Sequence, residues 1–312
     1  MAQVGASVDV GSNSVHLLVA VIAGQRLEPL VDESVLLGLG ATVDATGSVG
    51  PARRAELVAA LVRYVDTARR LGAAAITLVG TEPLRRASDA DAVIDEVAQA
   101  AGEPLTVLSH EEEAYLTLLG VTSGRRVTSE LGIVDVGGGS SEVVLVSPGR
   151  PARAGGVQVG SARLTAQVVA HDPPTRGEIA ALRAEARARV VDAPDGHPQE
   201  LVAVGGTSSN LLRVLPASAL DRTLTLARLA EALDILATEP AAQASERHAV
   251  NLVRARILPA GAAILEALLL RYGLDRLSVS EAGIREGAII AAARAGDAWR
   301  SRLPELAEGW RR

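Results

Sequence analysis

Short apolar runs alternate along this chain with bends of glycine and small polar residues. Residues 8–22 contain two β-rich apolar runs, separated by an acid and a cluster of small polar residues. Residues 133–146 show the same arrangement. Two β-rich runs joined by a tight polar bend predict a β-hairpin. The pattern therefore predicts two hairpins of one design.

The two hairpins align at a constant offset of 126 residues (135 minus 9), which places Asp135 on Asp9. Two further pairs of segments follow the hairpins. Residues 75–84 and 200–212 each read as a strand, a glycine turn and a helix start, and residues 105–121 and 276–290 each read as a strand leading to a helix. Three matched pairs in the same order indicate an internal duplication.

Each half thus reads as three strands followed by alternating helices and strands, with helical spacing clear at residues 51–72. The second half carries extra helical stretches before its last strand. We expect a duplicated α/β fold with a cleft between the copies, a common place for ligands. The predicted domains are 1–124 and 125–312, the second with a helical insertion. The sequence does not decide on which half the last helix, from about residue 284, packs.

Composition narrows the possible chemistry of these domains. The chain has 312 residues, 48% of them hydrophobic and 22% charged, as in globular proteins of about two domains. It has no cysteine, which excludes disulfides, thiolate zinc sites and cysteine-dependent phosphatase chemistry. It also has no lysine, which excludes a P-loop lysine and Schiff-base chemistry.

Charge and hydropathy favour a cytoplasmic protein without a membrane or nucleic-acid partner. The net charge of −6 disfavours a general contact with DNA or RNA. The N-terminus lacks a basic region before its apolar stretch, and no uninterrupted apolar run approaches the roughly 20 residues of a membrane helix. Oligomeric state is left open, a homodimer included.

The bends predict phosphate binding, because glycine turns at strand ends let backbone N–H groups approach an anion. A single such turn has a simpler interpretation as a tight hairpin, but a matched pair with the same preceding acid favours a ligand. The candidate phosphate-binding residues of the two bends are Gly11, Ser12, Asn13, Ser14, Gly137, Gly138, Gly139 and Ser140.

The acids beside the bends predict a metal site. An unpaired carboxylate in an apolar strand is costly, and a hydrated magnesium ion (Mg2+) held by Asp9 and Asp135 would resolve this. Glu142, across the second bend, would serve the same ion or a water, or is an exposed strand residue. His16 occupies the matching position in the first half, and we expect a hydrogen-bonded core or turn residue there.

Two other charged groups have plain structural explanations. Residues 111–113 are three successive glutamates at a probable helix start, where acids are stabilised by the helix dipole, and at most one would face a cleft. The paired arginines of residues 51–72 favour a solvated helix face over a track for polyphosphate.

Taken together, the stretches "VDVGSNSVHLL", "SHEEEAYLTLLGV", "IVDVGGGSSEVVLV", "GSARL", "AVGGTSSNL" and "SEAGIREGAII" resemble, in this order, the exopolyphosphatase and guanosine pentaphosphate phosphohydrolase family. The resemblance covers nearly the whole chain. It implies two RNase H-like domains of the actin, Hsp70 and sugar-kinase fold, and magnesium-dependent release of orthophosphate from polyphosphate or guanosine pentaphosphate.

The resemblance also assigns roles. Glu113 is similar to the catalytic base that orients the attacking water, and Asp135 and Glu142 to the residues associated with metal and activated water. Arg85 matches an arginine that contacts substrate phosphate. The glycine turn within residues 200–212 adds three candidate phosphate-binding residues, Gly205, Gly206 and Thr207.

Two departures from the family pattern are visible. "GTEPLRRA" places Glu82 and Pro83 where small neutral residues are more usual, which puts phosphate contacts from this turn in doubt. Longer members add a C-terminal helical HD domain, and without it we expect a different grip on long chains. Our prediction is a polyphosphate hydrolase. The alternatives are a guanosine pentaphosphate hydrolase, a catalytically poor sensor of either ligand, and an actin-like kinase.

Overall fold

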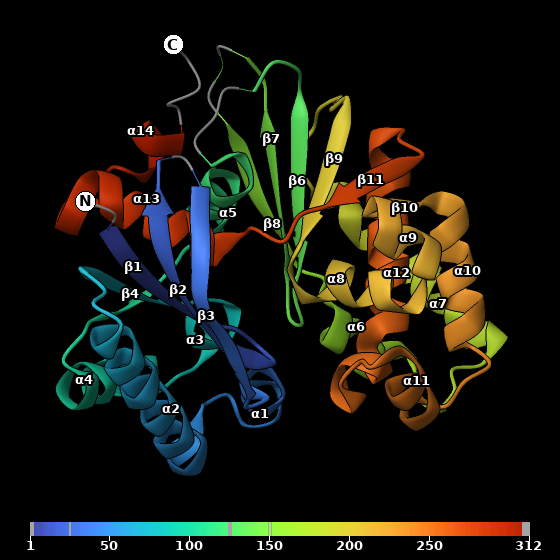
Figure 1. Ribbon diagram of the computed structural model, residues 1–312. Coiled ribbons are helices and arrows are strands. Elements are labelled where there is room, and N and C mark those ends of the chain that lie inside the picture. The colour runs from blue at the N-terminus through green and yellow to red at the C-terminus, as the bar shows by residue number, and fades with distance from the viewer. Residues whose placement is uncertain (1–2, 25, 124–126, 149, 151, 308–312) are drawn as a thin grey trace. The chain divides into compact units, whose positions relative to one another are not determined.

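The computed structural model describes residues 3–24, 26–123, 127–148, 150 and 152–307 (Figure 1). The chain divides into two compact units, one of residues 1–126 and 282–312 and one of residues 127–281. The division after residue 126 lies close to the boundary after residue 124 that the sequence predicts. The predicted second domain, 125–312, differs from this division because residues 282–312 belong to the first unit.

A five-stranded mixed sheet forms the centre of the first unit, in the order β3-β2-β1-β4-β5 (Figure 1). Its strands are β1 (Gln3–Val10), β2 (Ser14–Ala23), β3 (Arg26–Leu36), β4 (Ala75–Gly80) and β5 (Leu105–Val107). Strands β1, β2 and β3 are antiparallel neighbours, whereas β4 and β5 run parallel to β1. The predicted hairpin is therefore β1–β2.

Helices cover both faces of this sheet. They are α1 (Leu39–Thr46), α2 (Gly50–Arg70), α3 (Glu82–Arg86), α4 (Ala90–Ala101), α5 (His110–Thr122), α13 (Ile284–Ala295) and α14 (Leu303–Ala307). The side chains of β2 alternate between the two faces, as its pleat requires. Leu17 and Val19 pack in the core under α2 and α4, whereas Leu18 and Ala20 pack against Ile289 of α13.

The second unit repeats the topology of the first. Its strands are β6 (Leu131–Val136), β7 (Ser141–Val146), β8 (Arg153–Val157), β9 (Glu200–Val204), β10 (Thr223–Thr225) and β11 (Arg276–Val279). The order β8-β7-β6-β9-β11 corresponds strand by strand to β3-β2-β1-β4-β5, and β10 is an added antiparallel edge strand. This correspondence confirms the predicted duplication.

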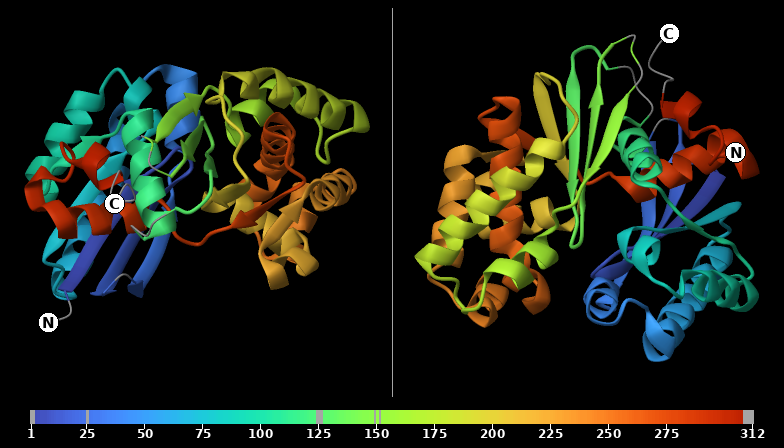
Figure 2. Two further views of the ribbon diagram at one scale, coloured as in Figure 1. Left: turned by 90° about the horizontal axis from the view of Figure 1, so that it is seen from above. Right: turned by 180° about the vertical axis from the view of Figure 1, so that it is seen from behind.

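The helices of the second unit gather on one face of its sheet (Figure 2). They are α6 (Ser161–Val168), α7 (Arg176–Arg189), α8 (Gly205–Val214), α9 (Pro216–Asp221), α10 (Leu226–Leu236), α11 (Ala241–His248) and α12 (Leu252–Tyr272). The predicted helical insertion is the segment from α10 to α12. Helix α12 is central, because its residues 258–269 are all buried, and it contacts α6, α7, α8, α10 and α11. No helix among the described residues has the length and apolarity needed to cross a membrane.

Helix α13 follows the last strand of the second repeat but packs in the first unit, against α5. The two helices meet through glycine. A Cβ atom on Gly120 would lie 1.9 Å from the carbonyl oxygen of Gly283, and one on Gly287 would lie 1.8 Å from the carbonyl oxygen of Leu116. Any larger residue would force the helices apart, so these two positions require glycine.

Candidate functional site

The two hairpin bends close with the same hydrogen bond. The N–H of Gly11 donates to the carbonyl of Ser14 at 3.0 Å, and the N–H of Gly137 donates to the carbonyl of Ser140 at 3.0 Å. Each bend thus has two central residues, Ser12 and Asn13 in the first and Gly138 and Gly139 in the second. The hydrogen bonds of the peptide groups in the two bends can be compared position by position.

The carbonyl groups of the second bend point to the start of helix α6. The N–H of Ser161 donates to the carbonyl of Gly137 at 2.8 Å, and the N–H groups of Ala162 and Arg163 donate to the carbonyl of Gly138 at 2.9 and 3.0 Å. In the part of the chain that the structure describes, the N–H groups of Gly138 and Gly139 donate no hydrogen bond. Carbonyls that are occupied and N–H groups that are not form a concave donor set suited to an anion.

In the first bend, the engaged carbonyls are those of the two central residues. The N–H groups of Leu37 and Gly38 donate to the carbonyl of Asn13 at 3.1 and 3.0 Å, and the N–H of Gly40 donates to the carbonyl of Ser12 at 2.8 Å. Gly40 lies in the first turn of α1, the counterpart of α6, and Leu37 and Gly38 directly precede that helix. Both predicted phosphate-binding bends therefore have carbonyls that are engaged by the following helix.

Close approach by glycine holds the second bend against α6. A Cβ atom on Gly160 would lie 2.5 Å from backbone atoms of Gly138 and Gly139. The sequence singled out the stretch that contains Gly160 only by its resemblance to a family. The contact shows its physical role, which is to bring the helix terminus within hydrogen-bond range of the bend.

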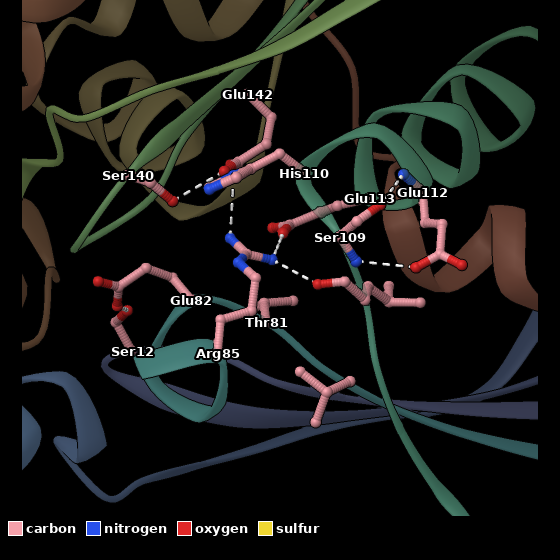
Figure 3. A network of polar contacts seen from close by, with 12 residues as sticks. Ser12, Thr81, Glu82, Arg85, Ser109, His110, Glu112, Glu113, Ser140 and Glu142 are labelled. Atoms are coloured by element: carbon pink, nitrogen blue, oxygen red, sulfur yellow. Dashed lines mark hydrogen bonds and ion pairs between the residues drawn. The ribbon is translucent and has the colours of Figure 1, made fainter. Parts of the chain in front are cut away.

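Two carboxylates lie opposite each other in the second hairpin. Asp135 of β6 pairs in register with Glu142 of β7, and directly opposite residues of an antiparallel pair point to the same face. Glu142 is buried and accepts a hydrogen bond from the hydroxyl of Ser140 at 2.7 Å (Figure 3). Burial raises the pKa of Asp135 to about 6. This pair of acids offers the oxygen ligands that Mg2+ prefers.

The β9–α8 turn closes around Asp135. Gly205 has a φ of +80°, and a Cβ atom on it would lie 2.4 Å from Oδ1 of Asp135. The hydroxyl of Thr207 donates to the carbonyl of Val136 at 2.7 Å. A Cβ atom on Gly206 would lie 2.4 Å from a guanidinium nitrogen of Arg254, so a positive charge lies against this turn. Sequence reasoning missed Arg254, because α12 lies far from the turn along the chain.

The first hairpin differs at the position opposite its acid. Asp9 pairs in register with His16, and Nε2 of His16 lies 2.6 Å from the hydroxyl oxygen of Ser14. His16 is therefore a hydrogen-bonded residue beside the turn, as the sequence predicts. Only one carboxylate occupies this cross-strand pair, in contrast to the two of the second hairpin.

Arg85 of α3, which is partly buried, and Glu113 of α5, which is buried, form an ion pair in the first unit (Figure 3). One guanidinium nitrogen of Arg85 donates to Oε2 of Glu113 at 2.7 Å and to the carbonyl of Leu108 at 2.9 Å. The other terminal nitrogen lies 3.1 Å from Nδ1 of His110. Burial and the charge of Arg85 hold the pKa of His110 below its usual value, so a neutral ring accepts this hydrogen bond.

The structure separates the three glutamates that the sequence could not distinguish. Glu111 is exposed and accepts a hydrogen bond from the Tyr115 hydroxyl at 2.6 Å. Glu112 caps the helix through Ser109. Glu113 alone is buried, and it alone pairs with Arg85. Glu113 is also the residue that the family resemblance selects.

Glu82, which is unusual for the family at this position, accepts hydrogen bonds from a serine and an arginine side chain. The hydroxyl of Ser12 donates to Oε2 of Glu82 at 2.9 Å (Figure 3). Arg86 bonds both Glu82 and Asp44. The turn after β4 thus presents a buried carboxylate to the first bend. The Ser12 hydroxyl is already engaged as a donor to this carboxylate, which supports the doubt about phosphate contacts from the turn.

Comparisons with known proteins identify the family of this chain. The model of the Ppx/GppA phosphatase family matches residues 18–294. The chain belongs to this family. It is 29% identical over 301 residues to Exopolyphosphatase 1 of Mycobacterium tuberculosis, with 90% of this chain and 86% of the relative covered. It is 30% identical over 319 residues to Exopolyphosphatase 2 of the same organism, with 90% and 96% covered.

Solved structures place the fold in the same family. The structure of the Aquifex aeolicus PPX-GPPA enzyme superposes with a TM-score of 0.78 at 27% identity, covering 93% of this chain and all of that one. The predictions of a duplicated actin-like α/β fold and of a hydrolase of this phosphatase family are confirmed. The predicted roles of individual residues in this family member stay predictions.

Three of the four paired arginines of α2 are salt-bridged at its surface, and the fourth, Arg70, donates to the hydroxyl of Thr67. Arg53 pairs with Glu56, Arg54 with Glu96 and Arg69 with Glu103. A polyphosphate track requires arginines that are free to bind phosphate. The prediction of a solvated helix face therefore agrees with these contacts.

Proposed function

We propose that this family member releases orthophosphate from the end of inorganic polyphosphate by magnesium-assisted, in-line attack of water. The observation that carries the proposal is the second bend, whose unengaged N–H groups at Gly138 and Gly139 lie beside the cross-strand carboxylates Asp135 and Glu142. The names of the relatives described above support polyphosphate as the substrate.

In this proposal the two bends and the metal neutralise the phosphates. The N–H groups of both bends donate hydrogen bonds to phosphate oxygens, with the Gly205–Thr207 turn as a further donor set. Asp135 and Glu142 hold Mg2+, with Asp9 as a further ligand. When bound, the ion supplies charge neutralisation to the phosphate oxygens. The residues fit such an ion, because two acids point to one face of the hairpin and Gly205 leaves room beside Asp135.

Glu113 acts as the base that orients the attacking water. Phosphoryl transfer depends mostly on positioning and charge neutralisation, so an oriented carboxylate is sufficient for this role. Without substrate, the hydrogen bond from Arg85 occupies Oε2 of Glu113. A substrate phosphate competes for Arg85, and Glu113 is then able to accept a proton from water.

Glu113→Gln tests the proposal, with Glu111→Gln as the matched control on the exposed side of the same helix turn. Orthophosphate release is measured on polyphosphate, guanosine pentaphosphate and ATP, each with and without magnesium. We expect release from polyphosphate only with magnesium, a loss of about 10²- to 10⁴-fold in Glu113→Gln, and unchanged activity in Glu111→Gln. Polyphosphate binding should survive in both variants.

Each other outcome identifies an alternative. Release from guanosine pentaphosphate in preference to polyphosphate would establish the second substrate. Tight binding of either ligand by the wild type without turnover would indicate a sensor. Product formation from ATP only when an acceptor is present would indicate a kinase. Equal loss of binding and turnover in Glu113→Gln would contradict the role of a base.

A further inference from the structure

The start of helix α5 determines where Glu113 points. Helix α5 begins with a capping box, in which the N–H of Glu112 donates to the Ser109 hydroxyl at 3.1 Å and the N–H of Ser109 donates to Oε2 of Glu112 at 2.8 Å. The N–H of Glu113 donates to the carbonyl of Ser109 at 3.0 Å. Any loosening of this first turn would displace the Glu113 carboxylate.

Arg300, in the C-terminal segment, forms hydrogen bonds with the first turn of α5 and with the strand before it. Its Nε donates to Oε1 of Glu112 at 2.6 Å, and a terminal nitrogen donates to Oε2 of Glu112 at 3.1 Å. That nitrogen also donates to the carbonyl of Val107 at 3.1 Å. Arg300 thus contacts both sides of the β5–α5 junction, the last residue of the strand and the capping residue of the helix.

The pKa of Glu112 reflects this contact. Burial alone would raise the pKa of its carboxyl group. The hydrogen bonds from Arg300 and from Ser109 outweigh burial and hold the pKa below its usual value. Glu112 is therefore ionised at neutral pH, as a bidentate contact with a guanidinium requires.

The segment that carries Arg300 is anchored in the apolar core beside α5. Leu303 is fully buried, and Trp299 and Leu306 pack in the same cluster as Leu108 and Leu116. Helix α13, which precedes this segment, is in backbone contact with α5. Arg300 itself lies in an exposed turn, and the residues around it, Trp299 and Leu303, attach that turn to the core.

We propose that Arg300 is a positioning residue for Glu113, acting through Glu112 and the capping box of α5. The inference rests on the role of Glu113 in the proposed function. Arg85 holds the β5–α5 junction at Leu108 and Glu113, and Arg300 holds it at Val107 and Glu112. Two arginines that contact the junction from different elements fix the first helical turn before substrate binds.

Arg300→Gln, Arg300→Lys and Glu112→Gln test this role, together with the double variant Arg300→Gln/Glu112→Gln. Arg302→Gln is the matched control, because Arg302 lies on the same segment and pairs only with the exposed Glu305 among the described residues. Steady-state phosphate release gives kcat and KM for polyphosphate. Hydrogen exchange gives the protection of the Glu112 and Glu113 amides.

We expect Arg300→Gln to lower kcat about tenfold with little change in KM, since a misplaced base slows the chemical step and leaves phosphate binding intact. Arg300→Lys, which keeps the charge, should recover part of the loss. The double variant should lose no more than the stronger single variant, because both changes break one interaction. The exchange protection should fall in parallel, and Arg302→Gln should match the wild type.

Wild-type kcat and wild-type exchange in Arg300→Gln would overturn the proposal, as would additive losses in the double variant. A parallel rise in KM would indicate a general structural effect instead. If the wild type releases no phosphate from any substrate, the proposed function fails, whereas the exchange measurement still decides whether Arg300 orders the first turn of α5.

Discussion

Replacing Asp135 by asparagine should make the folded protein more stable at neutral pH and less active. Burial raises the pKa of Asp135 from 3.8 to about 6. A carboxyl group with a raised pKa favours folding when it is protonated. This contribution is complete below about pH 4 and is lost as the pH rises through about 6. At pH 7 and above, the ionised Asp135 therefore destabilises the fold.

The magnitude follows from the shift. A rise of about two pKa units corresponds to about 3 kcal/mol at about 1.4 kcal/mol per unit. This value is an upper limit, because the Asp135 residue is only partly buried in terms of surface area and solvent screens part of the effect. We expect Asp135→Asn to gain about 1 to 3 kcal/mol over the wild type at about pH 8, and much less at about pH 4.

Urea unfolding of both proteins, followed by circular dichroism at several pH values without metal, measures this difference. Asp234→Asn, on the exposed face of α10, is the control for the change in net charge. Magnesium should stabilise the wild type more than Asp135→Asn, while the variant loses activity and needs more magnesium. A stability difference that does not change with pH would refute the reasoning from burial.

Two further predictions concern glycine contacts. Gly120→Ala and Gly287→Ala should each destabilise the protein by about 3 kcal/mol, since the new methyl group would overlap a backbone carbonyl. Gly177→Ala is the control, because the nearest atom to its new methyl group would be 3.8 Å away, and it should not destabilise the protein. Urea unfolding of the three variants measures these differences. Gly160→Ala should push α6 from the second bend and raise KM for polyphosphate about tenfold, and wild-type kinetics would contradict that role for the contact.

The hairpins could be predicted in detail because their information is local. A short bend between two β-rich runs fixes which residues face each other, and the offset of 126 residues then transfers the pairing from one hairpin to the other. The structure places Asp135 opposite Glu142 and Asp9 opposite His16, as the alignment implies. The third pair of segments is also confirmed, since β5 and β11 are both parallel strands next to the strand of the second pair.

The placement of α13 could not be predicted from its pattern. Its residues are apolar on several faces, because it packs on α5 and also against β1, β2 and β4. A helix that is apolar nearly all round indicates burial but not which core it joins. The glycine contacts that select α5 depend on Leu116 and Gly283, which are distant in sequence.

The hydrogen-bond partners of the polar residues in the site could not be predicted from the sequence either. Arg85 was expected to bind phosphate, and in the ligand-free structure it bonds Glu113, Leu108 and His110. Ser12 was expected to do the same, and it donates to Glu82. These contacts join α3 to residues that are 23 to 70 positions away in the chain. Spacing within a motif gives no information about them.

The duplication explains why one half is better suited to bind a metal than the other. Both hairpins supply a bend whose carbonyls are engaged by the following helix, so both are suited to phosphate. The residue opposite the acid is His16 in one and Glu142 in the other. Two carboxylates on one face repel each other unless a cation or a proton lies with them. A single difference at equivalent positions therefore makes the second hairpin the better source of metal ligands.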